Sequence, residues 1–136
     1  MRANVGNLAN YEEEVFVKGV YEVEVTKAEA TESDRTGSEG TTLHMTILDG
    51  PDLDSGEPSQ GQKIITTLWH PNAGMKDGGK FAGRTLRKAC EVANVKFDET
   101  GFDIDEFVGA IFNVRLKPEE YEGETRPVVK AFLPSA

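Results

Sequence analysis

The 136-residue chain has 24 acidic and 15 basic residues, a formal net charge of −9, and a single cysteine. One cysteine excludes an internal disulfide and a cysteine-based zinc site, and the length indicates one domain. The start of the chain lacks the apolar run of a signal peptide, and no stretch is long and apolar enough to span a membrane. We therefore expect a cytoplasmic protein.

The charge is unevenly distributed along the chain. Between Lys63 and Lys96 there are seven basic and two acidic residues, a balance of +5, whereas the remainder carries 8 basic and 22 acidic residues, a balance of −14. Charge alone favours ordinary solvated surfaces for both regions. The alternative is that the basic third of the chain contacts nucleic acid, which the overall net charge would otherwise argue against.

The first half of the chain predicts a loose arm and two strands. Residues 1–14 offer little to bury, so we expect a flexible N-terminal arm. From Val15 to Thr26 apolar and polar residues alternate, which predicts a half-buried strand with a bend or bulge at Gly19. A mobile loop is expected from Thr31 to Gly40 and a second strand from Thr41 to Leu48.

The third strand is predicted from Lys63 to Trp69, although its phase is ambiguous because Ile64 and Ile65 are adjacent. If Ile64 faces the core, so do Thr66 and Leu68. The outer face of the strand then carries Lys63, Ile65, Thr67 and Trp69. A loop from His70 to Gly79 follows.

The stretch from Phe81 to Asn94 predicts the one helix. Its apolar residues recur with a 3.6-residue period, basic residues fill the other side, and Asn94 is suited to close the helix in the left-handed conformation. We expect burial of Leu86, Cys90 and Ala93 and exposure of Arg84, Arg87 and Lys88.

After the helix, an acidic connection from Phe97 to Glu106 has room for a short helical turn. Two more strands are predicted, from Val108 to Lys117 and from Arg126 to Leu133, joined by a hairpin turn at Gly123.

Three strands, a helix and two strands predict a mainly β fold over residues 15–136. We expect a five-stranded antiparallel barrel like the oligonucleotide/oligosaccharide-binding fold (OB-fold), with one α-helix between strands three and four. Another small barrel, or a sandwich with a covering helix, is the alternative.

No catalytic pattern is present in the sequence. P-loop, dinucleotide-binding, HExxH and GxSxG motifs are all missing. The acidic run from Asp49 to Glu57 lacks the ligand spacing of an EF-hand. We therefore expect no enzyme activity, no metal and no cofactor.

Single-stranded nucleic acid is bound by aromatic faces for the bases and a positive groove for the backbone. On an OB-fold the ligand face lies on strands two and three and the loops beside them. Trp69, the sole tryptophan, fits either a base-stacking position or the core. The candidate nucleic-acid-binding residues are Arg35, His44, Lys63, Trp69, His70, Lys76, Lys80, Arg84 and Tyr121.

Several stretches together resemble a known group. They are KGVYEV (18–23), LDGP (48–51), LWHPN (68–72), LRKACEVANV (86–95) and EYEGETRPVVKAFLP (120–134). The chain resembles a family of small bacteriophage proteins of uncertain annotation that is similar to OB-fold single-stranded-DNA-binding proteins and found near recombination and replication genes.

The resemblance implies a protein that coats single-stranded DNA without sequence preference during phage replication or recombination, in the cytoplasm of a bacterial host. Phage replication or recombination proteins and further copies of the chain are the partners it suggests. Many such proteins recruit others through an acidic tail, but this chain has no acid after Glu124. The second hypothesis is an OB-like or β-sandwich adaptor that binds protein, either in phage assembly or as a modulator of a host enzyme.

Overall fold

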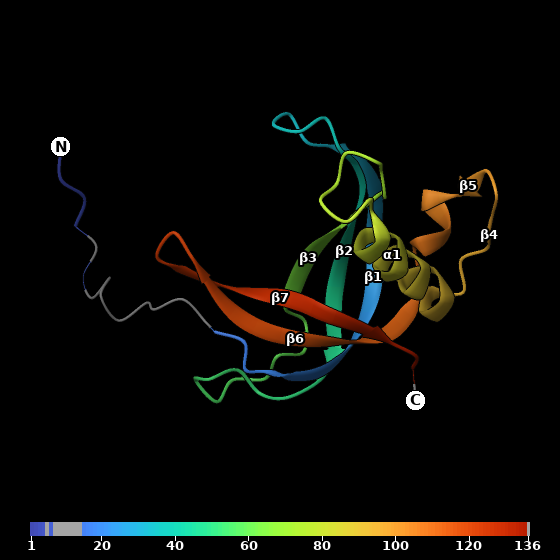
Figure 1. Ribbon diagram of the computed structural model, residues 1–136. Helices are drawn as coiled ribbons and strands as arrows, with labels where there is room; N and C mark the ends of the chain where they lie inside the picture. Colours follow the sequence, from blue (N-terminus) through green and yellow to red (C-terminus); the bar gives the residue numbers. More distant parts are fainter. Residues whose placement is uncertain (5, 7–14, 136) are drawn as a thin grey trace.

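The computed structural model describes residues 1–4, 6 and 15–135, so most of the arm expected over residues 1–14 lies outside the described residues. Five long strands form one antiparallel sheet in the order β3-β2-β1-β6-β7 (Figure 1). The strands are β1 (Gly19–Glu32), β2 (Glu39–Asp49), β3 (Lys63–Trp69), β6 (Ile111–Tyr121) and β7 (Glu124–Leu133).

Helix α1 (Lys80–Ala93) lies between β3 and β6 in the chain, as expected. It is followed by a small hairpin of β4 (Phe97–Asp98) and β5 (Gly101–Phe102) and by the 3-10 helix η2 (Ile104–Phe107), the short turn expected in the acidic connection. No helix in the described part of the chain is long and apolar enough to cross a membrane.

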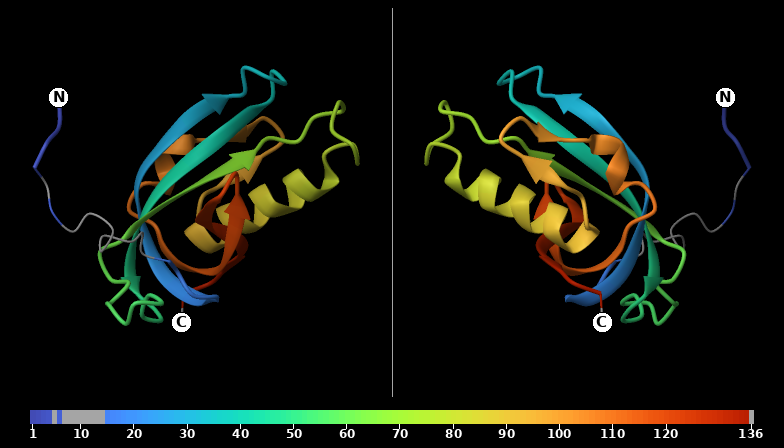
Figure 2. Two further views of the ribbon diagram at one scale, coloured as in Figure 1. Left: turned by 90° about the vertical axis from the view of Figure 1, so that its left-hand side faces the viewer. Right: turned by 90° about the vertical axis from the view of Figure 1, so that its right-hand side faces the viewer.

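The sheet is curved and open. Figure 2 shows it bending around α1, which packs against both edge strands, β3 and β7. These edges approach each other, but among the described residues no hydrogen-bonded ladder joins them. The predicted five strands, antiparallel pairing and helix position are confirmed, whereas the sheet does not close into a barrel. The side chains of Ala82 and Thr85 on α1 line the gap between the two edges.

β1 is longer than predicted and is shifted toward the C-terminus, because it serves two neighbours. Its first residues, from Gly19 to Glu24, pair with β6, and residues Glu22 to Glu32 pair with β2. The register with β2 shifts between Glu22 and Val23 and between Val25 and Lys27. The irregularity predicted at Gly19 therefore lies further along the strand. The predicted loop of residues 31–40 therefore shrinks to residues 33–38.

β6 starts three residues later than predicted, because residues 108–110 turn the chain after η2. The Gly109 amide donates to the Val25 carbonyl, and the Val25 amide donates to the Ala110 carbonyl. β6 then extends to Tyr121, and a two-residue turn at Glu122 and Gly123 leads into β7. The hairpin turn thus lies where the sequence predicted it.

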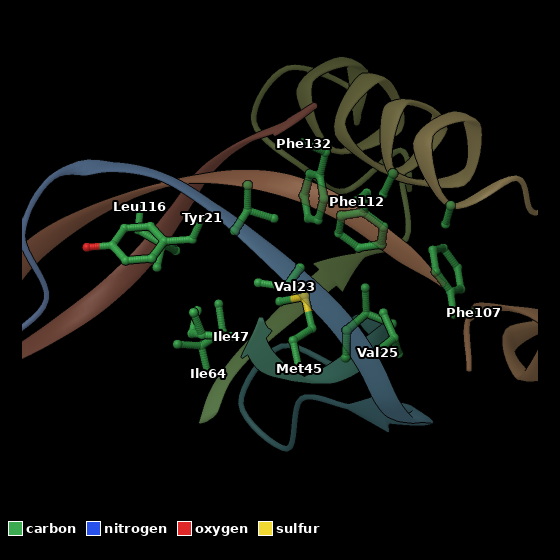
Figure 3. Close-up of a cluster of buried hydrophobic side chains, with 14 of the residues drawn as sticks. Tyr21, Val23, Val25, Met45, Ile47, Ile64, Phe107, Phe112, Leu116 and Phe132 are labelled. Carbon is green, nitrogen blue, oxygen red and sulfur yellow. The ribbon is translucent and has the colours of Figure 1, made fainter. Parts of the chain in front are cut away.

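The core fills the concave side of the sheet (Figure 3). Alternate residues of β1, β2 and β6 supply most of it. The Tyr21 hydroxyl donates to the Val17 carbonyl at 2.6 Å, so its one polar atom is satisfied. The largest fully buried side chains include Tyr21, Phe107, Phe112, Leu43, Met45, Ile47 and Leu116.

Helix α1 has the predicted polarity, with one correction. Cys90 and Ala93 are buried together with Ala89, and Arg84, Arg87 and Lys88 are exposed. Leu86 is only half-buried, since it lies at the margin of the core beside Phe97 and Phe102 of the small hairpin. Asn94 ends the helix with a φ of 61°, and its amide donates to the carbonyls of Cys90 and Glu91.

Candidate nucleic-acid interface

The outer face of β1, β2 and β3 carries the candidate site. Antiparallel pairing places Ile65 of β3 opposite His44 of β2, Thr67 opposite Thr42, and Trp69 opposite Gly40. Ile64 and Leu68 are buried, so alternate residues of β3 from Lys63 to Trp69 face away from the core, as predicted for this phase. Lys63 and Trp69 are six positions apart along the strand, a span of about 20 Å.

Trp69 is partly exposed, and its position depends on Gly40. Its side chain is 38% exposed, and Ile65, on the same face, is 60% exposed. A β-carbon added at Gly40 would lie 2.9 Å from Cε3 of the Trp69 indole. The indole thus lies against the backbone of β2, with its other side available. This settles whether Trp69 belongs to the core, which the sequence could not decide.

Next to Trp69, three threonine hydroxyls form a hydrogen-bonded row across the three strands. Oγ1 of Thr31 lies 2.5 Å from Oγ1 of Thr42, which lies 3.0 Å from Oγ1 of Thr67. Each hydroxyl has one proton and two acceptor sites, so the row retains hydrogen-bonding capacity for a ligand. Sequence analysis missed Thr31 and Thr42, because only the register of β1 and β2 brings them beside Thr67.

His44 belongs to a small charged cluster on the same face. Its Nε2 lies 2.9 Å from Oε1 of Glu29, whose other oxygen lies 3.3 Å from Nζ of Lys27. The hydrogen bond from His44, and then that from Lys27, lower the pKa of the Glu29 carboxyl. The Glu29 carboxylate is therefore held between the side chains of His44 and Lys27. Lys27 was not among the residues expected from sequence.

The other predicted cations flank the Trp69 end of this face. Arg35 lies in the turn between β1 and β2, Lys76 in the loop before α1, and Lys80 and Arg84 on α1, and all four are exposed. Figures 1 and 2 show the turn and the loop side by side. Together they border a hollow of about 410 Å³ beside Trp69, lined by Ser33, Thr36, Ser38, Met75, Asp77, Phe81 and Ala82.

Two predicted site residues lie elsewhere. His70 follows Trp69 and points to the opposite side of the sheet, where Nε2 is 2.8 Å from the buried Thr41 hydroxyl and the ring meets Phe102 edge-on. Tyr121 stands at the β6–β7 turn, which Figure 1 shows far from both α1 and the β1–β2 turn. The Arg126 guanidinium lies 5.6 Å from the centre of its ring.

Acidic side chains gather beside β4, β5 and η2, next to Glu29 of the candidate face. A hollow of about 770 Å³ beside β4, β5 and η2 is lined by Asp98, Asp103, Asp105 and Glu106, with Lys96 at its border. Within the described residues, no group of three or more histidine, cysteine, aspartate or glutamate side chains is placed to hold a metal ion.

A family model described as "Protein of unknown function (DUF669)" matches residues 3–136, which is nearly the whole chain. No curated protein matches the chain.

Proposed function

This chain belongs to the DUF669 family, and we propose that it binds single-stranded DNA without sequence preference on the outer face of β1, β2 and β3. The observation that carries the proposal is the partly exposed indole of Trp69, held against Gly40 at one end of this face. Stacking on an aromatic face tolerates any base, which suits binding without sequence preference.

The arrangement of the strands supports an OB-fold with an open seam. β1 pairs with both β2 and β6, and the helix lies between the third and fourth long strands, the order expected of that fold. The proposed face on β2 and β3 is the one that OB-folds use for oligonucleotides. α1 packs at the seam between β3 and β7, and Ile65 and Trp69 on the proposed face remain exposed.

Different residues of the face contact the bases and the phosphates of the single-stranded DNA. Trp69 stacks a base and the exposed Ile65 contacts the next base or sugar along β3. Lys63 and Lys27 meet phosphates on the sheet, and Lys76, Lys80, Arg84 and Arg35 meet them beyond Trp69. The hydroxyls of the threonine row bond to base edges or phosphates. No cofactor or metal takes part in binding of this kind.

The resemblance to small phage proteins near recombination and replication genes supports a setting in phage DNA replication or recombination. The protein would then act in the cytoplasm of a bacterial host, where replication or recombination proteins and further copies of this chain are its expected partners. Coating of exposed strands needs no base readout, in agreement with a face that offers one stacking ring and many small hydroxyls.

Anisotropy of a fluorescently labelled oligo-dT tests the proposal. Trp69→Ala should weaken binding by about 1–3 kcal/mol, the range for one base–aromatic stack. Tyr121→Ala is the matched control, because it removes an exposed aromatic ring far from the proposed face. Equal affinities for wild type and Trp69→Ala would contradict the proposal.

The second candidate, a protein-binding adaptor, has one observation in its favour. The acid-lined hollow beside β4, β5 and η2 is suited to a basic protein rather than to a phosphate backbone. An adaptor that uses this region would give no oligo-dT binding at low salt, whereas the proposed function requires it.

A further inference from the structure

Phe81, the second residue of α1, is exposed without a packing reason. Its side chain is 75% exposed, more than Ile65, Trp69 or Tyr121. It also stands outside the stripe of Ala89, Cys90 and Ala93 that α1 buries. An aromatic ring left this open at the start of a helix is a candidate contact for a ligand.

The surroundings of Phe81 on the helix are basic. Arg84 and Lys88 follow it by three and seven residues, so both lie on the same side of α1 as the ring. Lys80 directly precedes it as the first residue of the helix. None of the three has an ion pair among the described residues. An apolar ring among free cations fits the two parts of a nucleotide, the base and the phosphate.

Trp69 and Phe81 together border two hollows. The first, toward the β1–β2 turn, is the one lined by Ser33, Thr36 and Ser38. The second, of about 350 Å³, follows the gap between β3 and β7 and is lined by Leu68, Thr85, Val129 and Phe132 among others. Phe81 is therefore adjacent to the proposed stacking residue, and the site continues from the sheet onto the helix.

The first hollow has polar groups that remain open to a ligand. Oγ of Ser33 and Oγ1 of Thr36 each accept one backbone amide, from Thr36 and Ser38 respectively, so both hydroxyl protons are still available. Asp77 is the one acid in its lining, and its two oxygens accept the amides of Gly79 and Phe81. The carboxylate thus holds the backbone of Phe81 in place.

We infer that Phe81 is a second base-stacking position, and that a bound strand continues past Trp69 onto the start of α1. This inference rests on the proposed function. The ligand is a nucleobase of the same single strand, since a planar ring with polar edges matches an aromatic and methionine wall facing serine and threonine hydroxyls. Lys80 and Arg84 then hold the phosphates of this second segment.

Oligo-dT of different lengths distinguishes binding at Phe81 from binding on the sheet face alone. A strand of about 4 nucleotides fills the sheet face alone, whereas one of about 12 reaches α1, both within the range of site sizes for OB-folds. Phe81→Ala should weaken binding of the long oligonucleotide about tenfold, leave the short one unchanged, and preserve the quenching of Trp69 emission. Phe97→Ala is the control, because Phe97 is also exposed, at 46%, but lies beyond the other end of α1.

Thermal melts of both variants check that folding is intact, which the exposure of both rings favours. The inference is overturned if Phe81→Ala binds the long oligonucleotide as wild type does, or loses affinity equally at both lengths. If the wild type binds neither length, the proposed function fails with it. Wild-type binding with Trp69 quenching but no effect of Phe81→Ala rejects the inference alone.

Discussion

At the scale of single residues, the exposed ring of Trp69 owes its position to Gly40. With no side chain at that position, the indole can lie against the backbone of β2. The neighbouring Thr67 methyl and the Leu68 carbonyl would lie 3.0 and 3.2 Å from an added β-carbon, so the space is closed on three sides. The position of the proposed stacking residue therefore depends on the absence of a side chain at Gly40.

Gly40→Ala should displace the indole, since the added carbon would meet it at 2.9 Å. We expect the Trp69 emission to shift and oligo-dT to bind more weakly, although no binding side chain is removed. Gly74→Ala is the control, since an added carbon there would meet only the side-chain oxygen of Asn72, at 3.2 Å. Unchanged emission and affinity in Gly40→Ala would show that the position of the Trp69 indole does not depend on Gly40.

Asp77 links the start of α1 to pH. Hydrogen bonds from the Phe81 and Gly79 amides lower the pKa of its carboxyl below the usual value. A depressed folded-state pKa stabilises the fold above the unfolded-state value, near 3.9, and the contribution is lost as pH falls through the folded-state pKa. Thermal melts should show Asp77→Ala less stable than wild type at pH 7, with the difference narrowing below about pH 4. A difference that stays constant down to pH 3 would mean that the charge of Asp77 has no part in it.

At the scale of elements, two glycines near the start of α1 have opposite effects on its stability. Gly79 precedes the helix with a φ of 87°, and an added β-carbon would lie 2.9 Å from the Asn72 nitrogen. Gly83 lies within the helix, where an added carbon would meet Pro71 at an ordinary 3.6 Å. Gly83→Ala should therefore stabilise the protein by up to about 1 kcal/mol, and Gly79→Ala should destabilise it by more than about 1 kcal/mol. Denaturant melts that rank the two variants the other way would refute this account of the helix start.

Because Leu86 is only half-buried, we expect it to contribute modestly to the free energy of unfolding. Leu86→Ala should cost about 2 kcal/mol, the low end of the range for buried leucines, because part of the side chain already faces water. Lys88→Ala, on the exposed side, should cost less than about 0.5 kcal/mol. If urea melts show similar losses in the free energy of unfolding for both variants, the face of α1 that carries Leu86 is not the one that packs on the core.

The sequence predicted the elements better than their ends. Alternation left the phase of β3 open, because Ile64 and Ile65 are adjacent, and the structure shows the phase that leaves Lys63 in solvent. The end of β1 was missed because Thr31 and Glu32 have turn-like neighbours, and only pairing with β2 makes them strand. The open seam was also beyond sequence analysis, since it depends on how α1 packs between β3 and β7.

The candidate site was predictable in its types of residue and less so in its geometry. Alternation places Trp69 and Lys63 on the outer face once Ile64 is known to be buried. His70 could have been placed by the same rule, since it follows Trp69 and so faces the other side. Gly40, Thr42 and Lys27 gain their places only from strand register, and the exposure of Phe81 depends on where α1 begins. The periodic pattern of a single helix or strand does not contain the register between strands or the packing between elements.

At the scale of the whole molecule, basic side chains cluster around Trp69 and acidic side chains around the small hairpin and η2. The cations lie on the loop before α1 and on α1, and the acids line a hollow that also includes Glu29 of the proposed face. The single-stranded DNA of the proposed function would thus lie along basic side chains, although the protein as a whole is acidic. The acidic remainder, with its balance of −14, lowers affinity most at low salt, where screening is weakest.

The salt dependence of oligo-dT binding should reflect the number of phosphates that the basic side chains neutralise. With about four phosphates neutralised, log K should fall against log salt with a slope near −3, because single strands give about −0.7 per contact. Lys63→Ala and Lys80→Ala should each make the slope shallower by about 0.7 without abolishing the quenching of Trp69. Slopes unchanged in both variants would show that these two lysines do not neutralise phosphates.

The most direct test of the account is the intrinsic emission of Trp69 during a titration with oligo-dT at low salt. The chain has one tryptophan, so the signal reports on the proposed stacking position alone. We predict saturable quenching that salt reverses, because a base covers the exposed side of the indole. Unchanged emission together with unchanged oligonucleotide anisotropy would contradict single-strand binding on this face.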